Sequence, residues 1–129
     1  MRLLLQASKL NHELRGGRQH FLRWSPTETA SALNEAGILY DSTLGFADRA
    51  GFRCGVCYEY PMYDLVKRRQ LQLRQRPLVV MECTVIDERY QGLGSGERAY
   101  HGDFTILWHN TRLFNEAEKD LYCLVIGEN

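Results

Sequence analysis

The apolar and polar positions of the chain alternate in short blocks that predict an α/β fold. Residues 25–37 have a helical pattern, because Ser25 can cap the helix and Glu28 can complete a capping box. Gly37 suits the left-handed residue that ends such a helix. The apolar residues 38–40 that follow predict a short buried strand.

Further apolar runs predict more strands of the same sheet. Residues 77–86 and 104–108 are nearly continuous apolar runs, which are typical of strands covered on both faces. Residues 18–24 indicate a strand end that runs into a loop, so the strand–helix–strand order of a parallel sheet begins here. The run 121–126 fits either a last strand or the end of a helix that begins near Asn115. We therefore expect mostly parallel strands.

Two polar segments interrupt this order. Residues 42–64 are rich in glycine and aromatic residues and predict a long ordered loop, which in a compact domain usually has a function. Residues 67–76 are strongly basic, with Leu71 and Leu73 alternating, and predict an edge strand or an extended connector. Sixteen basic residues offset sixteen acidic ones, and a neutral chain does not favour a nucleic-acid partner.

The length and composition indicate one ordinary globular domain over residues 1–129. The chain has 129 residues, of which 44% are apolar and 25% charged. No apolar run reaches the roughly 20 residues that span a bilayer. Residues 1–14 are loosely helical, and their apolar start is too short for an export signal, so we expect a cytoplasmic protein.

Two short motifs are weak as sites. Cys54 and Cys57 have the spacing of a zinc knuckle or a redox pair, but no second pair of ligands follows at a suitable distance along the chain. With four cysteines in a reducing compartment, we expect free thiols. The glycines of residues 92–96 lack the strand and helix that a phosphate loop needs, and predict a flexible connection.

Several side chains that could carry chemistry follow or interrupt the predicted strands. His109 comes directly after the strand 104–108, where open α/β sheets place functional groups. Glu82 lies within an apolar run, and a buried carboxylate needs a partner, for which His109 is a candidate. Arg18 and His20 end an earlier strand, and Arg18 could hold a carboxylate through two hydrogen bonds. Alternatively, each could be an ordinary backbone-bonded or surface residue.

Three stretches of the chain resemble the later half of the polysaccharide deacetylase-like (NodB-homology) proteins, in the branch linked to bacterial surface-polysaccharide clusters. The stretches are GGRQHFLRWSPTETASALNEAGILYDSTLGFADRAGFRCGVCYEYPMYD, RPLVVMECTVID and FTILWHN, and they cover about residues 15–110. The resemblance implies a partial, distorted (β/α) barrel. It also implies metal-dependent hydrolysis of N-acetyl groups on amino sugars in surface-polysaccharide (O-antigen type) biosynthesis, usually with zinc.

The resemblance also implies roles for individual residues. His109 matches the histidine that protonates the departing amine, and Arg18 matches the arginine that orients the base aspartate. Glu82 falls where the family usually has an aspartate near the acid histidine. The weaker candidates lie in motifs that line the cleft and would bind substrate; they are His20, Asp41 and Arg53.

The family's metal ligands and base have no counterpart here, so we expect this chain alone to hold no metal. They precede the arginine motif, but only 17 residues precede Arg18, and these contain His12 and no aspartate. We therefore expect a C-terminal portion that is inactive alone. Its partners would be an acetylated amino-sugar glycan and either a second copy or another subunit that completes the barrel.

Two other functions stay open. The chain could be a non-catalytic module that binds a glycan or a partner through residues 42–64, or a decayed fragment without function. In the first case aromatic rings would stack on sugars, and Tyr60 is the residue to test. The aromatic candidates in this loop are Phe52, Tyr58, Tyr60 and Tyr63.

Overall fold

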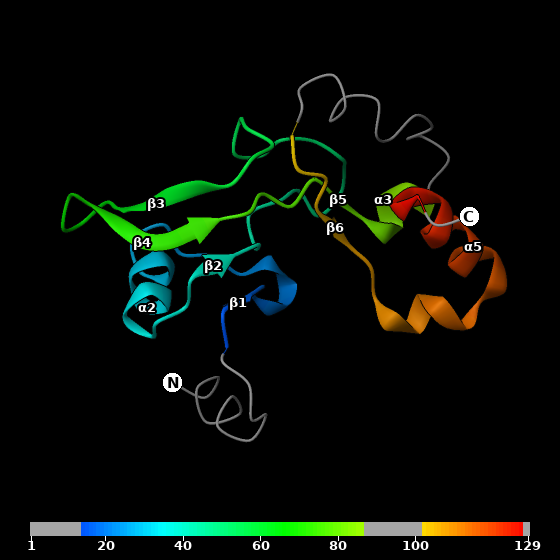
Figure 1. Ribbon diagram of the computed structural model, residues 1–129, viewed down its shortest axis with the longest axis horizontal. Coiled ribbons are helices and arrows are strands. Elements are labelled where there is room, and N and C mark those ends of the chain that lie inside the picture. Colours follow the sequence, from blue (N-terminus) through cyan, green and yellow to red (C-terminus); the bar gives the residue numbers. More distant parts are fainter. Residues whose placement is uncertain (1–13, 87–101, 128–129) are drawn as a thin grey trace. The chain divides into compact units, whose positions relative to one another are not determined.

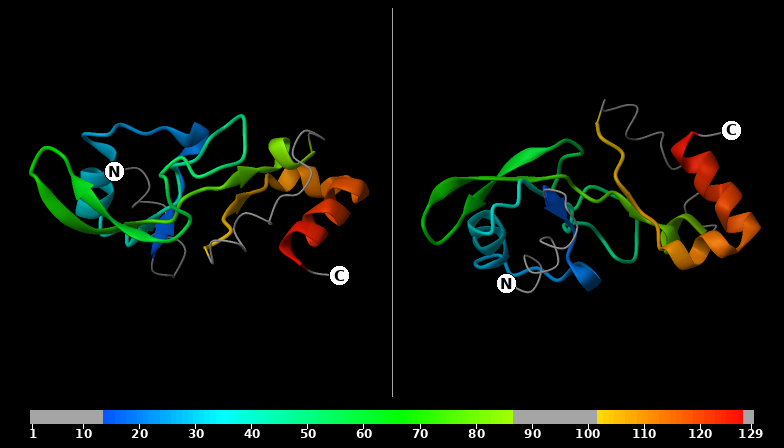
Figure 2. Two further views of the ribbon diagram at one scale, coloured as in Figure 1. Left: turned by 90° about the horizontal axis from the view of Figure 1, so that it is seen from above. Right: turned by 60° about the horizontal axis from the view of Figure 1, so that its bottom comes forward.

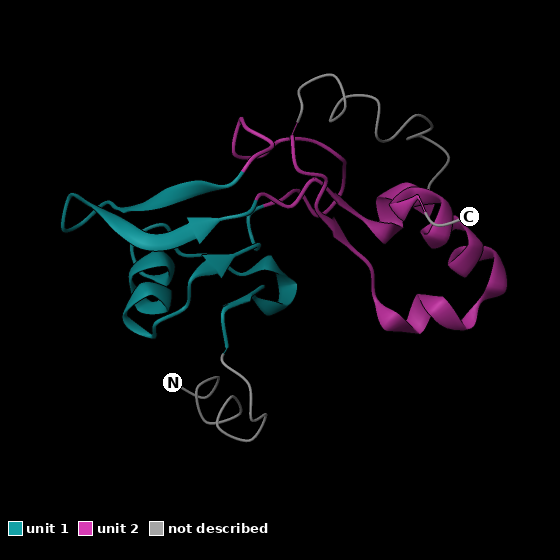
Figure 3. Ribbon diagram, viewed as in Figure 1, with its two compact units in different colours: residues 1–44, 59–76 teal, residues 45–58, 77–129 magenta. Residues whose placement is uncertain are grey.

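The computed structural model describes residues 14–86 and 102–127, which form two compact units (Figure 3). Unit 1 contains the described residues up to Leu44 together with Glu59–Arg76, and unit 2 contains Gly45–Tyr58 and the described residues from Pro77 onward. Two compact units can belong to one domain, so the single domain stays a prediction. The helix expected over residues 1–14 and the connection at 92–96 lie almost entirely outside the described residues.

Unit 1 is built on a four-stranded sheet with the order β1-β2-β4-β3 (Figure 1). β1 (Gly16–Gly17) pairs in parallel with β2 (Tyr40–Asp41), and β2 pairs in parallel with β4 (Arg69–Gln75). β3 (Tyr60–Asp64) is antiparallel to β4. The predicted strand–helix–strand order is present, but its first strand is Gly16–Gly17 and not residues 18–24, which contain no strand. The last five residues of the expected loop 42–64 form a strand.

The basic segment is an interior strand of this sheet, which corrects the expected edge strand. β4 has β2 on one side and β3 on the other. Its alternate residues Leu71, Leu73 and Gln75 are buried, while the residues between them are exposed. This period-2 pattern places the apolar side chains against the core and leaves the basic ones on the other face. β4 is therefore hydrogen-bonded to a strand on each side, while the face of β4 that points away from the core is charged.

A short helix, α2 (Thr29–Glu35), covers one face of the sheet over β4 and β3 (Figures 1 and 2). Ala30 of this helix is buried in the core of unit 1. The helix begins later than the sequence predicts, and the capping box is absent from it: the Ser25 N–H donates to Oγ1 of Thr29 at 2.9 Å. Gly37 has a φ of 75°, as predicted for a left-handed helix end.

Unit 2 contains a two-stranded parallel sheet and the C-terminal helices. β5 (Val80–Met81) pairs in parallel with β6 (Ile106–Leu107). β5 leads directly into α3 (Glu82–Ile86), while η3 (Asn110–Phe114) and α5 (Glu116–Ile126) follow β6 (Figure 1). The run 121–126 is therefore the end of a helix, which settles the two alternatives.

The expected strand over residues 77–86 is wrong in its second half. Only Val80 and Met81 are in strand conformation, and the chain turns into α3 at Glu82. Leu78, Val79 and Val80 are nearly or fully buried. A short apolar run is compatible with a buried strand or a buried helix, so periodicity alone could not locate this change.

These elements establish a mixed α/β fold in which most strand pairings are parallel. The pairings β1–β2, β2–β4 and β5–β6 are parallel, and β3–β4 is antiparallel. The described strands form no closed barrel. None of the helices within residues 14–86 and 102–127 has the length and apolar character that a membrane crossing requires.

Candidate functional site

The parallel pairing of β5 and β6 brings Glu82 and His109 together in unit 2. Met81 is in register with Leu107, so the chain leaves both strands at the same edge of the sheet. Glu82 begins α3 immediately after β5, and His109 follows β6 by two residues. Nδ1 of His109 lies 2.5 Å from Oε1 of Glu82. The predicted pairing of these two side chains is confirmed.

The two side chains of this pair differ strongly in exposure. The Glu82 side chain is 5% exposed, whereas that of His109 is 52% exposed. A buried carboxylate bound to Nδ1 fixes the orientation of the ring and directs Nε2 away from the carboxylate. An imidazole held in this way can give a proton to a bound group or accept one from it. The pair is therefore suited to acid–base chemistry.

Some buried polar atoms of Glu82 and of residues close to the pair along the chain have no hydrogen-bond partner among the described residues. Within the described part of the chain, three buried atoms have no hydrogen-bond partner near this strand edge: Oε2 of Glu82, Oγ1 of Thr84 and Nε1 of Trp108. Burying such groups without a partner is unfavourable, so each requires an explanation. In Glu82 only one carboxylate oxygen is engaged by His109.

Arg53 has a structural contact within the loop of unit 2. Its NH1 group donates to the carbonyl oxygen of Gly45 at 2.9 Å. Gly45 itself lies against Leu78, because a Cβ at this glycine would be 2.6 Å from the Cβ of Leu78. Arg53 thus closes a loop that is packed on the apolar run before β5. Its expected role in substrate binding stays a prediction.

Unit 1 contains a second polar cluster, formed by Arg18, Asp41, Ser42 and Thr43. Arg18 donates from Nε to the Ser42 carbonyl oxygen at 2.7 Å and from NH2 to the Ser42 hydroxyl at 2.9 Å. The Asp41 carboxylate accepts from the N–H and the hydroxyl of Thr43, both at 2.7 Å. Arg18 therefore makes two directed hydrogen bonds, as expected, but to Ser42 rather than to a carboxylate.

The electrostatics of this cluster are dominated by burial. Asp41 is 1% exposed, and desolvation raises its pKa above the ordinary value, although the Thr43 hydrogen bonds and the charge of Arg18 oppose the shift. Burial also lowers the pKa of Arg18, against the influence of Asp41. The carboxylate and the guanidinium thus compensate part of each other's desolvation. Neither Ser42 nor Thr43 was predicted from the sequence.

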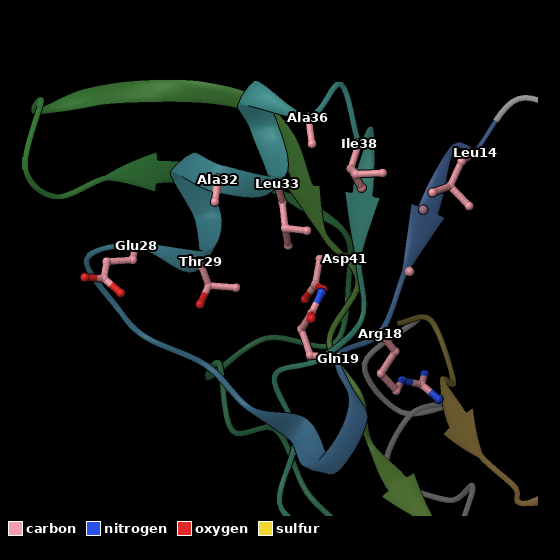
Figure 4. Close-up of a pocket in the computed structure, with 12 residues that line it drawn as sticks. Leu14, Arg18, Gln19, Glu28, Thr29, Ala32, Leu33, Ala36, Ile38 and Asp41 are labelled. Carbon is pink, nitrogen blue, oxygen red and sulfur yellow. The ribbon is translucent and has the colours of Figure 1, made fainter. Parts of the chain in front are cut away.

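A pocket of about 380 Å³ adjoins this cluster (Figure 4). Part of its apolar wall comes from α2 and the strands of the sheet. Its polar groups come from Arg18, Gln19, Glu28, Thr29 and Asp41. This volume lies within the range of small-molecule sites, which combine apolar walls with a few polar groups. The apolar lining consists of Leu14, Gly16, Gly17, Ala32, Leu33, Ala36 and Ile38.

His20 and Tyr60 have different settings from those predicted. Arg18 and His20 do not end a strand, because β1 stops at Gly17 and His20 begins the turn η1 (His20–Leu22). The His20 ring contacts Phe21 edge-on, with ring centroids 4.2 Å apart. Tyr60 lies in β3 opposite Gln75 of β4. Their roles in substrate binding stay predictions.

The donor set in the described residues does not fit the zinc site that the family resemblance implies. Residues 14–86 and 102–127 contain no group of three or more histidine, cysteine, aspartate or glutamate side chains that could hold a metal ion. A catalytic zinc site has three protein ligands as well as an open position. No step of a reaction can therefore be assigned to a metal held by these residues.

The structure thus brings Glu82 to His109 in unit 2, and Arg18 to the same cluster as Asp41 in unit 1. Comparison with models of protein families, with curated proteins and with solved structures found no match to this chain.

Proposed function

We propose that the chain is a polysaccharide deacetylase-like protein that supplies the acid side of an active site. Its reaction would be the hydrolysis of N-acetyl groups on amino sugars during surface-polysaccharide biosynthesis. The observation that carries this proposal is the Glu82–His109 pair, in which a buried carboxylate orients a half-exposed imidazole. Amide hydrolysis requires a proton for the departing amine, and an oriented imidazole is suited to provide it.

The cluster of unit 1 supports the proposal in a second way. In the family that the chain resembles, an arginine at the position of Arg18 orients the base aspartate. Here two hydrogen bonds to Ser42 fix the guanidinium, and the nearby Asp41 is buried. A fixed guanidinium is a suitable anchor for a carboxylate that another chain would contribute.

The described residues lack the metal ligands of the family, and this determines how the activity would arise. Because the described residues do not fit a zinc site, we propose that a second polypeptide contributes the metal ligands and the base. The partner would be another subunit or a second copy of this chain, and it would complete the partial (β/α) barrel. The substrate would be an acetylated amino-sugar glycan.

Complementation in trans tests this proposal. The purified chain is mixed with the first half of a NodB-homology deacetylase that carries the metal ligands, and acetate release from an N-acetylated oligosaccharide is measured with zinc present. We expect release from the mixture and none from either chain alone. His109→Gln should abolish release, and Glu82→Gln should reduce it. The matched control Glu116→Gln changes an exposed glutamate of α5 and should leave release unchanged.

Two results would contradict the proposal. If acetate release persisted with His109→Gln, and circular dichroism showed that this variant is folded, His109 would not be the proton donor. Stoichiometric zinc and turnover in the isolated chain would show that the metal site is complete without a partner.

A second candidate, non-catalytic glycan binding, is favoured by the exposed rings of Tyr58 and Tyr63. In this case the chain would bind the N-acetylated oligosaccharide, and no complementing half would produce acetate release. Replacement of Tyr60 by alanine would weaken binding if β3, in which Tyr60 lies, belongs to the binding surface.

A further inference from the structure

Two consecutive residues after β1 have backbone conformations that side chains disfavour. Phe21 has a φ of 57° and Leu22 has a φ of 50°, both in the left-handed region. Residues other than glycine rarely enter this region, and bulky ones least of all. Such strain persists only where the surroundings impose it, and it is concentrated at ligand-binding and catalytic sites.

The polar cluster of unit 1 anchors the start of this turn. The Gln19 N–H donates to Oγ1 of Thr43 at 2.9 Å, and Thr43 in turn is bound to Asp41. The Leu22 N–H then donates back to the Gln19 carbonyl oxygen at 3.0 Å and closes the turn. The start of the turn is thereby anchored to the buried cluster that adjoins the pocket.

The strained turn presents an aromatic ring to solvent. Phe21 is 79% exposed, so the fold gains little apolar burial from this side chain. The His20 ring packs edge-on against it, and the Arg23 guanidinium lies over the ring, 6.0 Å from its centroid. The residues His20 and Arg23 are themselves exposed. An exposed aromatic ring between two hydrogen-bonding side chains, held by an unfavourable backbone, has the features of a ligand platform.

We propose that Phe21 is a stacking platform for a pyranose ring of an N-acetylated amino-sugar glycan, with His20 and Arg23 as hydrogen-bonding partners of its hydroxyl groups. One face of a pyranose ring presents C–H groups, which pack on the electron-rich face of an aromatic ring. The guanidinium and the imidazole can donate hydrogen bonds to hydroxyl oxygens. This inference rests on the proposed function, because it names a residue that would bind the proposed substrate class.

The position of the turn agrees with this assignment. Gln19 lines the pocket of unit 1, and Phe21 follows it by two residues. Figure 4 shows Gln19 and Asp41 close together in the lining of the pocket. A glycan on the platform would therefore have polar groups of the same unit nearby.

Binding of a tetramer of N-acetylglucosamine to the isolated chain, measured by calorimetry or by NMR chemical shifts, tests this inference. Phe21→Ala should weaken binding about tenfold or more, equivalent to about 1.4 kcal/mol. Phe21→Trp should preserve binding, because the indole ring offers an equal or larger face. The control Phe114→Ala removes another highly exposed phenylalanine and should leave the affinity unchanged.

A glycine variant separates the ligand platform from a structural role. Phe21→Gly should raise the melting temperature, because glycine adopts a positive φ without strain, and it should also abolish binding. Phe21→Ala keeps the unfavourable backbone and should melt near the wild-type temperature, so its loss of binding would not reflect unfolding. A Phe21→Gly melting temperature at or below that of the wild type would overturn the strain argument.

Two further outcomes would overturn the platform without deciding the proposed function. One is equal affinity of wild type and Phe21→Ala, and the other is the absence of any binding of the tetramer by the wild type. The proposed function is decided separately by acetate release in the complemented mixture and its dependence on His109. A mixture that releases acetate equally well with Phe21→Ala would retain the function and reject the platform.

Discussion

The buried carboxylate of Glu82 lies 2.5 Å from Nδ1 of His109, an imidazole that is half exposed. In this arrangement, His109 provides the hydrogen-bond partner that the buried Glu82 needs. A charge that is removed from water needs a partner, and the partner here also extends to the surface where a ligand can reach it. Stability and proton transfer therefore depend on the same contact.

The stability of unit 2 should reveal this coupling. His109→Ala leaves the Glu82 carboxylate buried without its partner, which should lower the free energy of unfolding by about 1–3 kcal/mol. Adding Glu82→Gln to that variant removes the buried charge and should recover part of the loss. Urea unfolding of the wild type, both single variants and the double variant measures the coupling. Strictly additive effects would mean that the two side chains do not interact.

The Glu82–His109 pairing could be predicted from the sequence, although the helix that begins at Glu82 was not predicted. The burial of a carboxylate within an apolar run is unfavourable without a partner, and a histidine follows another predicted strand; these two features predict the pair. The change from β5 to α3 at Glu82 lies inside that same run, where strand and helix patterns coincide. The pairing survives this error, because both residues still follow neighbouring parallel strands.

The pH dependence of stability should contain a contribution from Asp41. Burial raises the pKa of Asp41 in the folded protein, so the folded state binds its proton more tightly than the unfolded state. This contribution is fully present below the ordinary pKa and is lost as the pH rises through the raised pKa. The free energy of unfolding of the wild type, relative to Asp41→Asn, should therefore decrease as the pH rises from below the ordinary pKa of an aspartate through the raised pKa of Asp41.

Asp64 in the same unit is the control with the opposite sign. Hydrogen bonds from the N–H of Lys67 and the hydroxyl of Ser31 lower the pKa of Asp64. Its contribution is present above the ordinary pKa and is lost as the pH falls through the lowered value. Relative to Asp64→Asn, the wild type should thus lose stability on acidification. Urea unfolding at a series of pH values compares both variants, and slopes of equal sign would contradict this account.

The cluster around Arg18 was predicted only in part. A hydrogen-bonded arginine was expected, but its partner Ser42 and the bonds from Thr43 to Asp41 depend on the backbone after β2. The strain at Phe21 had no sequence signal at all, since phenylalanine does not favour a positive φ. The start of that turn is anchored by the tertiary hydrogen bond from the Gln19 N–H to Thr43, and local propensity cannot reveal this contact.

The end of α2 should depend on the conformation of Gly37 rather than on its packing. Gly37 has a φ of 75°, and a Cβ at this position would meet nothing within 4 Å. Gly37→Ala should therefore lower the free energy of unfolding by about 1 kcal/mol through backbone strain alone. Gly17→Ala is the matched control, because its Cβ also meets nothing and its φ is not in the left-handed region. Equal effects of both variants on urea unfolding would contradict this explanation.

The N-terminus of α5 should depend on the side chain of Asn115. Its Oδ1 accepts the N–H groups of Ala117 at 3.0 Å and Glu118 at 3.4 Å, which the first turn of a helix cannot satisfy internally. Asn115→Ala should cost about 0.5–2 kcal/mol of stability, whereas Asn115→Asp keeps the acceptor and adds a negative charge that the helix dipole favours. Urea unfolding followed by the helical circular dichroism signal measures both variants. If Asn115→Asp were as destabilising as Asn115→Ala, the side-chain oxygen would not be the stabilising group, and the helix would have to be fixed by its packing instead.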